Sequence, residues 1–155
     1  MAAADERFTA RAAALGVEVD ARRFPQGTRT AAEAAAAIGC DVAQIVKSLV
    51  FIADDQPVLV LTSGANRVDE DRLATALGAA QVRKATAEEV RTATGYAIGG
   101  TPPFGHDRAL TVLCDRDLAA FEVVWAAAGT PMDVFAVRTD QLVEAAGARV
   151  LDLAG

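Results

Sequence analysis

The chain has 155 residues, a length typical of one domain that buries a hydrophobic core without disulfides or a structural metal. Its net charge of -6 argues against a general nucleic-acid coat protein, because such proteins bind phosphate through clustered lysine and arginine. Its two cysteines, Cys40 and Cys114, lie far apart and form no C-x-x-C pair, so we expect a single domain over residues 1–155 with neither a disulfide framework nor a zinc site.

The first seven residues include Asp5, Glu6 and Arg7, where a signal peptide would need an apolar stretch. No later segment has the length and hydrophobicity of a membrane span. We therefore expect a cytoplasmic protein without a membrane partner.

The first third of the chain alternates between helix and strand patterns. A helix is predicted over residues 4–15 with Gly16 as its stop, and apolar alternation predicts a strand over residues 17–24. Thr30-Ala31-Ala32-Glu33 is a capping box in front of an alanine run that ends at Gly39, so a second helix is expected there.

A hairpin follows. Asp41 is expected to cap one short turn, and the run from Ile45 to Ile52 predicts a buried strand. Residues 53–57 form a turn into a second strand over 58–62, and the pair predicts an antiparallel hairpin.

The rest of the chain is expected to add helices and short strands to the same sheet. The segment 121–128 fits a helix by one spacing and a strand by another; the turn signal at 129–132 favours the strand. The remaining predictions are helices over 69–77, 86–95 and 140–146 and strands over 81–83, 110–114, 133–137 and 149–153. We therefore expect an α+β fold with a mixed, mostly antiparallel sheet.

Lys47 is the most informative residue, because it lies inside the apolar run Ile45 to Ile52. Burying an ammonium group without a partner costs several kcal/mol, so such a lysine reaches solvent, forms an ion pair or faces a site. A lysine that reaches solvent is the simpler interpretation until a second feature supports a site.

The second feature is the loop from Gly99 to His106, which holds three glycines and two prolines. Glycine permits positive φ, and proline fixes φ and donates no hydrogen bond. Amides at Gly99, Gly100, Thr101 and Phe104 are the donors left before Gly105, and oriented amides of this kind bind carboxyl, carbonyl or phosphate oxygens. A rigid connection between a helix and a strand explains the loop equally well.

Several common catalytic arrangements are missing. The chain has no G-x-x-x-x-G-K-[ST] and no G-x-S-x-G motif, and His106 is its only histidine, which excludes a multi-histidine metal site. A backbone-bonded loop histidine is a simpler interpretation of His106 than a general base paired with Asp107.

These residues resemble the YbaK-type, prolyl-tRNA-synthetase-associated editing domains, a family of aminoacyl-tRNA deacylases. The resemblance covers nearly the whole chain. It rests on Gly27-Thr28-Arg29-Thr30, on Gln44 to Phe51, on the loop Gly95 to His106, and on Val124 to Pro131.

The resemblance implies a mixed sheet, partly closed like a barrel, surrounded by helices. It also implies hydrolysis of the ester that joins a wrong amino acid to tRNA, with no cofactor, no metal and no protein nucleophile. The residues that match the family's catalytic ones are Lys47 and the Gly99 to Pro103 loop, with Gly99, Gly100 and Thr101 as its catalytic members. Lys47 would supply positive charge, and the loop amides would hold the aminoacyl group.

The implied substrate-binding residues are Thr30, Ser48, Phe51, Pro102, Pro103, Phe104, His106 and Met132. Many members of the family carry a histidine near the position of Met132, so this difference leaves the cleaved amino acid open. Ser48 either bonds a small polar side chain or packs, and an N-cap explains Thr30 as well as a place in the pocket does.

The leading hypothesis is a deacylase that removes alanine, serine, threonine or cysteine from tRNA, most simply tRNA(Pro). Its expected partners are the acceptor end of mischarged tRNA and a synthetase, with no role for DNA. The alternatives are a non-catalytic module that binds an aminoacyl or nucleotide ligand beside a synthetase, and an unrelated ester or amide hydrolase with His106 as base.

Overall fold

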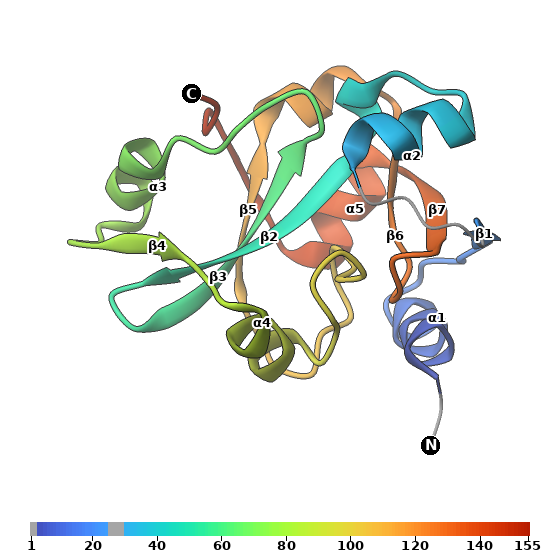
Figure 1. Cartoon of the computed structure of the whole chain (residues 1–155), viewed down its shortest axis with the longest axis horizontal. Helices are drawn as coiled ribbons and strands as arrows, with labels where there is room; N and C mark the ends of the chain where they lie inside the picture. Colours follow the sequence, from blue (N-terminus) through green and yellow to red (C-terminus); the bar gives the residue numbers. More distant parts are fainter. Residues whose placement is uncertain (1–2, 25–29) are drawn as a thin grey trace.

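The computed structural model describes residues 3–24 and 30–155 (Figure 1). The α-helices are α1 Ala4–Ala14, α2 Ala31–Ile38, α3 Glu70–Leu77, α4 Ala87–Thr94 and α5 Thr139–Ala146. The strands are β1 Arg22–Arg23, β2 Val46–Ala53, β3 Gln56–Ser63, β4 Val82–Lys84, β5 Thr111–Asp115, β6 Val123–Ala127, β7 Asp133–Arg138 and β8 Arg149–Leu151. Two 3-10 helices, η1 Val42–Gln44 and η2 Arg116–Ala120, complete a mixed α+β fold, as expected.

The larger sheet has the strand order β4-β2-β3-β5-β8. β2 pairs antiparallel with both β3 and β4, whereas β5 pairs parallel with β3 and β8. Asp54 and Asp55 connect β2 to β3 with φ values of 45° and 70°, the positive values that suit a two-residue hairpin turn. The predicted hairpin is therefore confirmed.

The smaller sheet has the order β1-β7-β6 and is antiparallel throughout. β6 includes Trp125, so the strand interpretation of this segment is confirmed. An isolated parallel bridge between Ile45 and Trp125 joins the two sheets, and Gln44 Nε2 donates to the Val123 carbonyl at 3.1 Å beside it. No further strand pairing links the sheets within the described residues, so they do not close into a barrel.

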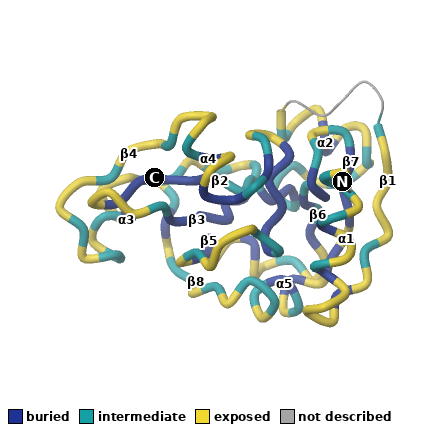
Figure 2. Tube along the Cα trace, turned by 90° about the horizontal axis from the view of Figure 1, so that it is seen from below, coloured by how far each residue is buried: buried dark blue, intermediate teal, exposed yellow. Residues whose placement is uncertain are grey.

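The main core fills the space between the sheets (Figure 2). Phe8 of α1, Phe104 of the loop after α4 and Phe135 of β7 form its aromatic centre, with ring centroids 5.1–6.0 Å apart. A second cluster, around Phe51 and Leu73, packs α3 against the other face of the larger sheet. The loop after α4 is thus fixed from the core side.

Local capping signals set the helix ends as expected. Thr30 accepts a hydrogen bond from the Glu33 amide at 3.1 Å, and α2 ends at Gly39 with φ of +87°. Thr86 and Glu89 form a complete capping box in front of α4.

The strand predicted over residues 17–24 is largely wrong. The Val17 amide donates to the Ala12 carbonyl at 2.9 Å, so this residue belongs to the end of α1, and only Arg22 and Arg23 pair with β7. The expected break at residues 25–27 and the family positions Gly27, Thr28 and Arg29 lie outside the described residues.

Candidate functional site

A cavity of about 680 Å³ opens between the two sheets beside the free half of β2. α2 and η1 form one wall, β2 from Val46 to Phe51 a second, the turn at residues 98–101 a third, and β6 with Trp125 a fourth. In Figure 1 the loop after α4 lies between β2 and β6. The volume falls in the usual range for small-molecule sites.

Lys47 lines this cavity from β2 and is partly buried. Its Nζ donates to the Asn66 carbonyl at 2.6 Å. Burial lowers the pKa of Lys47, the nearby cations Arg67 and Lys84 lower it further, and Asp115 opposes them. The lysine is therefore neither free in solvent nor neutralised by direct contact with a carboxylate.

The environment of Lys47 is held by a polar network. Asn66 Nδ2 donates to Oδ2 of Asp115 at 2.9 Å and to Oδ2 of Asp117 at 2.7 Å. Asp115 is 1% exposed and also accepts from the Ser63 amide at 3.2 Å. Because these bonds fix the turn that carries the Asn66 carbonyl, they fix the position of the ammonium group.

Gly99 and Thr101 line the same cavity from the opposite wall. The Gly100 amide donates to the Ala97 carbonyl at 3.0 Å and Gly99 has φ of +83°, which together describe a turn with glycine at its third position. Thr101 Oγ1 also donates to the Ala97 carbonyl, at 3.1 Å. The fold therefore brings the lysine strand and the glycine loop to one cavity.

The expectation that Gly100 offers a free amide is wrong, because that amide closes the turn. The amides of Gly99 and Thr101 have no partner in the described part of the chain. A Cβ on Gly100 would lie 2.8 Å from Thr130 Cα, so this glycine serves close packing against the β6–β7 turn.

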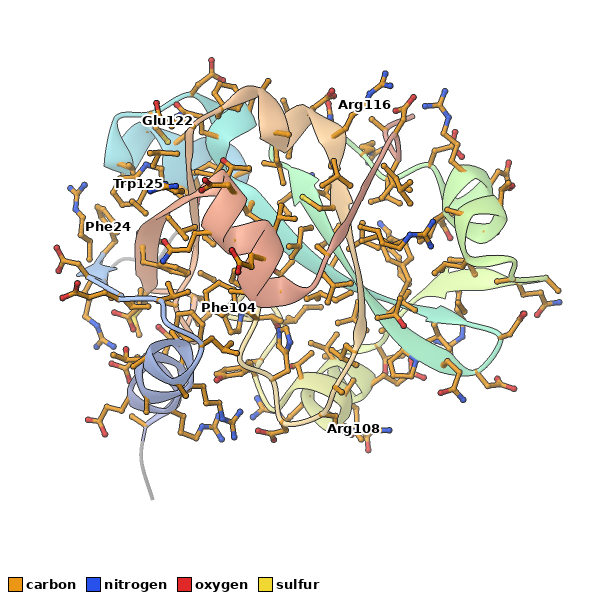
Figure 3. The ribbon with its side chains drawn as sticks, turned by 180° about the vertical axis from the view of Figure 1, so that it is seen from behind. Phe24, Phe104, Arg108, Arg116, Glu122 and Trp125 are labelled. Carbon is orange, nitrogen blue, oxygen red and sulfur yellow. The ribbon has the colours of Figure 1, made fainter. Side chains whose placement is uncertain are left out.

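The second half of the loop lies away from the cavity. Pro102 and Pro103 are buried, and Phe104 is 2% exposed in the aromatic core, where Figure 3 labels it. His106 Nε2 donates to the Pro102 carbonyl at 2.7 Å, and burial lowers the pKa of this histidine. None of these four residues lines the cavity, so the geometry does not support His106 as its base.

The other predicted substrate-binding residues divide in the same way. Thr30, Ser48 and Phe51 line the cavity, and Ser48 Oγ is buried without a hydrogen-bond partner among the described residues. Met132 does not line it; the Met132 carbonyl accepts from the Phe24 amide at 2.8 Å.

Trp125 and Lys84 line the cavity with aromatic and charged side chains, although neither was among the predicted site residues. Trp125 is the only tryptophan, and the Arg22 guanidinium lies 5.5 Å from the centroids of both the Trp125 and Phe24 rings. Figure 3 labels both of these aromatic residues. Lys84 also lines the cavity, so both lysines of the chain do. The scarcity of lysine beside 13 arginines is a sequence signal that could have found Lys84.

Some described cations pair with carboxylates, but the two that lie near Lys47 do not. Arg83 bonds Glu89 at 2.7 and 2.8 Å, and Arg72 lies 3.1 Å from Asp152. Lys84 and Arg67 have no carboxylate partner within residues 3–24 and 30–155. Both act electrostatically on Lys47, and Lys84 also lines the cavity.

Other classes of site find less support. In the described ranges, no group of three or more His, Cys, Asp and Glu side chains is placed to hold a metal ion. Nor do these ranges contain a helix with the length and hydrophobicity needed to cross a membrane.

The family model for the aminoacyl-tRNA editing domain matches residues 25–145. Among curated proteins, the chain is 41% identical over 90 residues to the proline–tRNA ligase of Ligilactobacillus salivarius, covering 58% of this chain and 16% of that enzyme. It is 32% identical over 110 residues to the proline–tRNA ligase of Limosilactobacillus fermentum, covering 67% of this chain and 19% of that enzyme. The chain thus corresponds to less than a fifth of these enzymes.

Solved structures match over nearly the full length. One, a candidate trans-editing enzyme for prolyl tRNA synthetase, is 41% identical with a TM-score of 0.94 and covers 100% of this chain and 99% of its own. Another, the hypothetical protein APE2540, is 30% identical with a TM-score of 0.88 and covers 96% of this chain and 99% of its own.

Proposed function

Because the chain belongs to the aminoacyl-tRNA editing domain family, we propose that it hydrolyses the ester between a small mischarged amino acid and tRNA, with tRNA(Pro) as carrier. The observation that carries the proposal is the shared cavity, whose lining includes both Lys47 and the turn residues Gly99 and Thr101. The cleaved amino acid would be alanine, serine, threonine or cysteine.

In the proposed reaction, water adds to the ester carbonyl carbon and the bond to the ribose oxygen breaks. The products are the free amino acid and the 3′ hydroxyl of the tRNA, which takes up a proton. The aminoacyl ester is already activated, so the protein has to position it and stabilise the negative charge that develops on the carbonyl oxygen. The reaction would need neither a metal ion nor a protein nucleophile, and chelators would leave it unchanged.

Lys47 would supply positive charge to the terminal nucleotide, and the amides of Gly99 and Thr101 would hold the aminoacyl group. The anchoring of Nζ on the Asn66 carbonyl supports this role, because an ammonium held in place needs no reorganisation when substrate binds. The remaining N–H groups of Lys47 have no partner among the described residues.

The cavity supports a small amino acid together with the terminal adenosine. Its volume of about 680 Å³ is larger than a small side chain alone would fill, and the alanines of α2 make one wall apolar. Ser48 Oγ is buried and has no partner in the described ranges, so it would bond a hydroxyl or thiol on the substrate.

The similar proteins and the cations near the cavity support tRNA(Pro) as the proposed substrate and a synthetase as the proposed partner. The curated relatives are proline–tRNA ligases, and the full-length match to a candidate trans-editing enzyme supports action in trans beside such a ligase. Lys84 and Arg67 would contact acceptor-end phosphates, since both lack carboxylate partners among the described residues.

The test is a hydrolysis panel with alanyl-, seryl-, threonyl- and cysteinyl-tRNA(Pro), each with and without EDTA, and prolyl-tRNA(Pro) as the correctly charged control. We expect release of at least one of the small amino acids and no release of proline. Affinity for these tRNAs without turnover would contradict the proposal and favour a binding module.

A further inference from the structure

Along β2 and the preceding Ile45, the backbone N–H and C=O groups of successive residues are directed alternately toward β3 and toward the opposite edge of the strand. The Ile45 carbonyl accepts from the Gly64 amide at 2.7 Å on the β3 side, and the Val50 carbonyl accepts from the Ala85 amide at 3.0 Å on the other side. Successive residues of a strand direct their N–H and C=O groups in opposite directions. Ser48 therefore presents both groups on the edge that faces away from β3.

In the part of the chain that the structure describes, that edge has no strand partner at Ser48. β4 pairs with β2 only at Phe51–Ala53, and the bridge from β6 reaches only Ile45. Ser48 aligns with Leu61 of β3, in a position where the alternation leaves no bond between them. Among the described residues, the N–H, the C=O and the hydroxyl of this cavity-lining serine are thus all without partners.

A free N–H and a free C=O on one strand residue match the groups of an aminoacyl ester. In an antiparallel pair, two opposite residues exchange both backbone bonds, each N–H donating to the other residue's carbonyl. The substrate carries a carbonyl oxygen that accepts and an α-ammonium that donates, separated by one Cα. It can therefore take the place of the missing strand residue.

We propose that the open edge of β2 binds the aminoacyl group as a one-residue strand partner of Ser48. The substrate carbonyl accepts from the Ser48 N–H, and the α-ammonium donates to the Ser48 carbonyl. This inference rests on the proposed function and adds the group that recognises the main chain of the amino acid. The geometry also lays the substrate side chain on the same face as Ser48 Oγ, because opposite residues in a sheet share a face.

The variant Ser48→Pro tests the N–H. Proline removes it, and the β2–β3 ladder does not use it, so the sheet tolerates proline at this edge position. Ser48→Ala removes only the hydroxyl and is the reference. If the N–H stabilises the developing oxyanion, kcat/KM of Ser48→Pro falls about 10²–10³-fold below that of Ser48→Ala, the usual loss for one such donor.

Amide NMR of the wild type tests the same contact without a variant. The probe is 3′-alanylamino-3′-deoxyadenosine, in which an amide replaces the ester. We expect a downfield shift of the Ser48 amide proton on binding, and weaker binding of the propionyl analogue that lacks the α-amino group.

The outcomes separate this inference from the proposed function. If the wild type hydrolyses none of the mischarged tRNAs, the proposed function fails. If the wild type is active but Ser48→Pro matches Ser48→Ala, the strand-edge inference fails alone. If Ser48→Pro does not fold, an unshifted Ser48 amide in the wild-type titration overturns it.

Discussion

Replacing Gly100 with alanine should move the glycine turn off the β6–β7 hairpin. The added Cβ would lie 2.8 Å from Thr130 Cα and 2.9 Å from Thr130 C, both backbone atoms. Ordinary contacts begin at 3.4 Å, so the turn must retreat by roughly 0.6 Å, the difference between 3.4 and 2.8. Overpacking of this kind costs about 1–3 kcal/mol, and each kcal/mol lowers Tm by about 2–4 °C in a domain of this size.

Because Gly99 and Thr101 flank the displaced residue, deacylation should fall together with stability. The matched control is Gly78→Ala at the end of α3, where φ is +65° and nothing lies within 4 Å of the new Cβ. Left-handed strain there costs about 1–2 kcal/mol, similar to the test variant. No residue of α3 lines the cavity, and in Figure 1 α3 lies on the other side of β2 from α2 and β6.

The assay is the deacylation rate at a temperature where both variants are folded by circular dichroism, together with their Tm values. We expect both variants to melt early and only Gly100→Ala to lose activity. Wild-type stability in Gly100→Ala would refute the close packing on Thr130. Equal activity in the two variants would refute the role of the turn.

Three further changes separate packing from chemistry. Phe104→Ala should lower the unfolding free energy by about 3–5 kcal/mol in a urea titration, since the ring fills the aromatic core; a change in substrate affinity at unchanged stability would contradict that placement. His106→Gln keeps an Nε2 donor for the Pro102 carbonyl, so the deacylation rate and its pH profile should stay the same; a lost ionisation in that profile would count against us. Asp133→Asn should cost about 1–2 kcal/mol at pH 7, because the hydrogen-bonded Arg23 holds the pKa of Asp133 below its usual 3.8. That stabilisation is present above pH 3.8 and lost as pH falls through the lowered pKa, so variant and wild type should converge in acid unfolding, and parallel curves would contradict it.

Local sequence signals predicted the features that local physics decides. The Thr30 N-cap of α2, the capping box of α4, the glycine ends of the helices and the hairpin around Asp54 follow from backbone geometry over a few residues. Lys47 stood out because burying an ammonium group in an apolar strand costs free energy, whichever elements pack against that strand. These signals need no knowledge of distant contacts.

Long-range packing decided the rest. Glycines and prolines indicated a shaped loop, but not that Phe104 would turn into the core while Thr101 lines the cavity. The apolar alternation at residues 17–21 predicted a strand. In the structure β7 pairs only with Arg22 and Arg23, so the strand is limited to those two residues. Trp125 fitted two periodicities, and only its pairing with β7 and its bridge to Ile45 place it at the cavity.

The most direct test of the account compares single-turnover hydrolysis of mischarged tRNA(Pro), on the substrate that the panel identifies, by wild type and Lys47→Ala. Lys47 and the glycine turn line one cavity and the ammonium is anchored there, so its removal should slow hydrolysis by at least about 10²-fold while Tm and far-ultraviolet circular dichroism stay close to wild type. Wild-type hydrolysis by a folded Lys47→Ala variant would contradict the assignment of this cavity as the deacylation site.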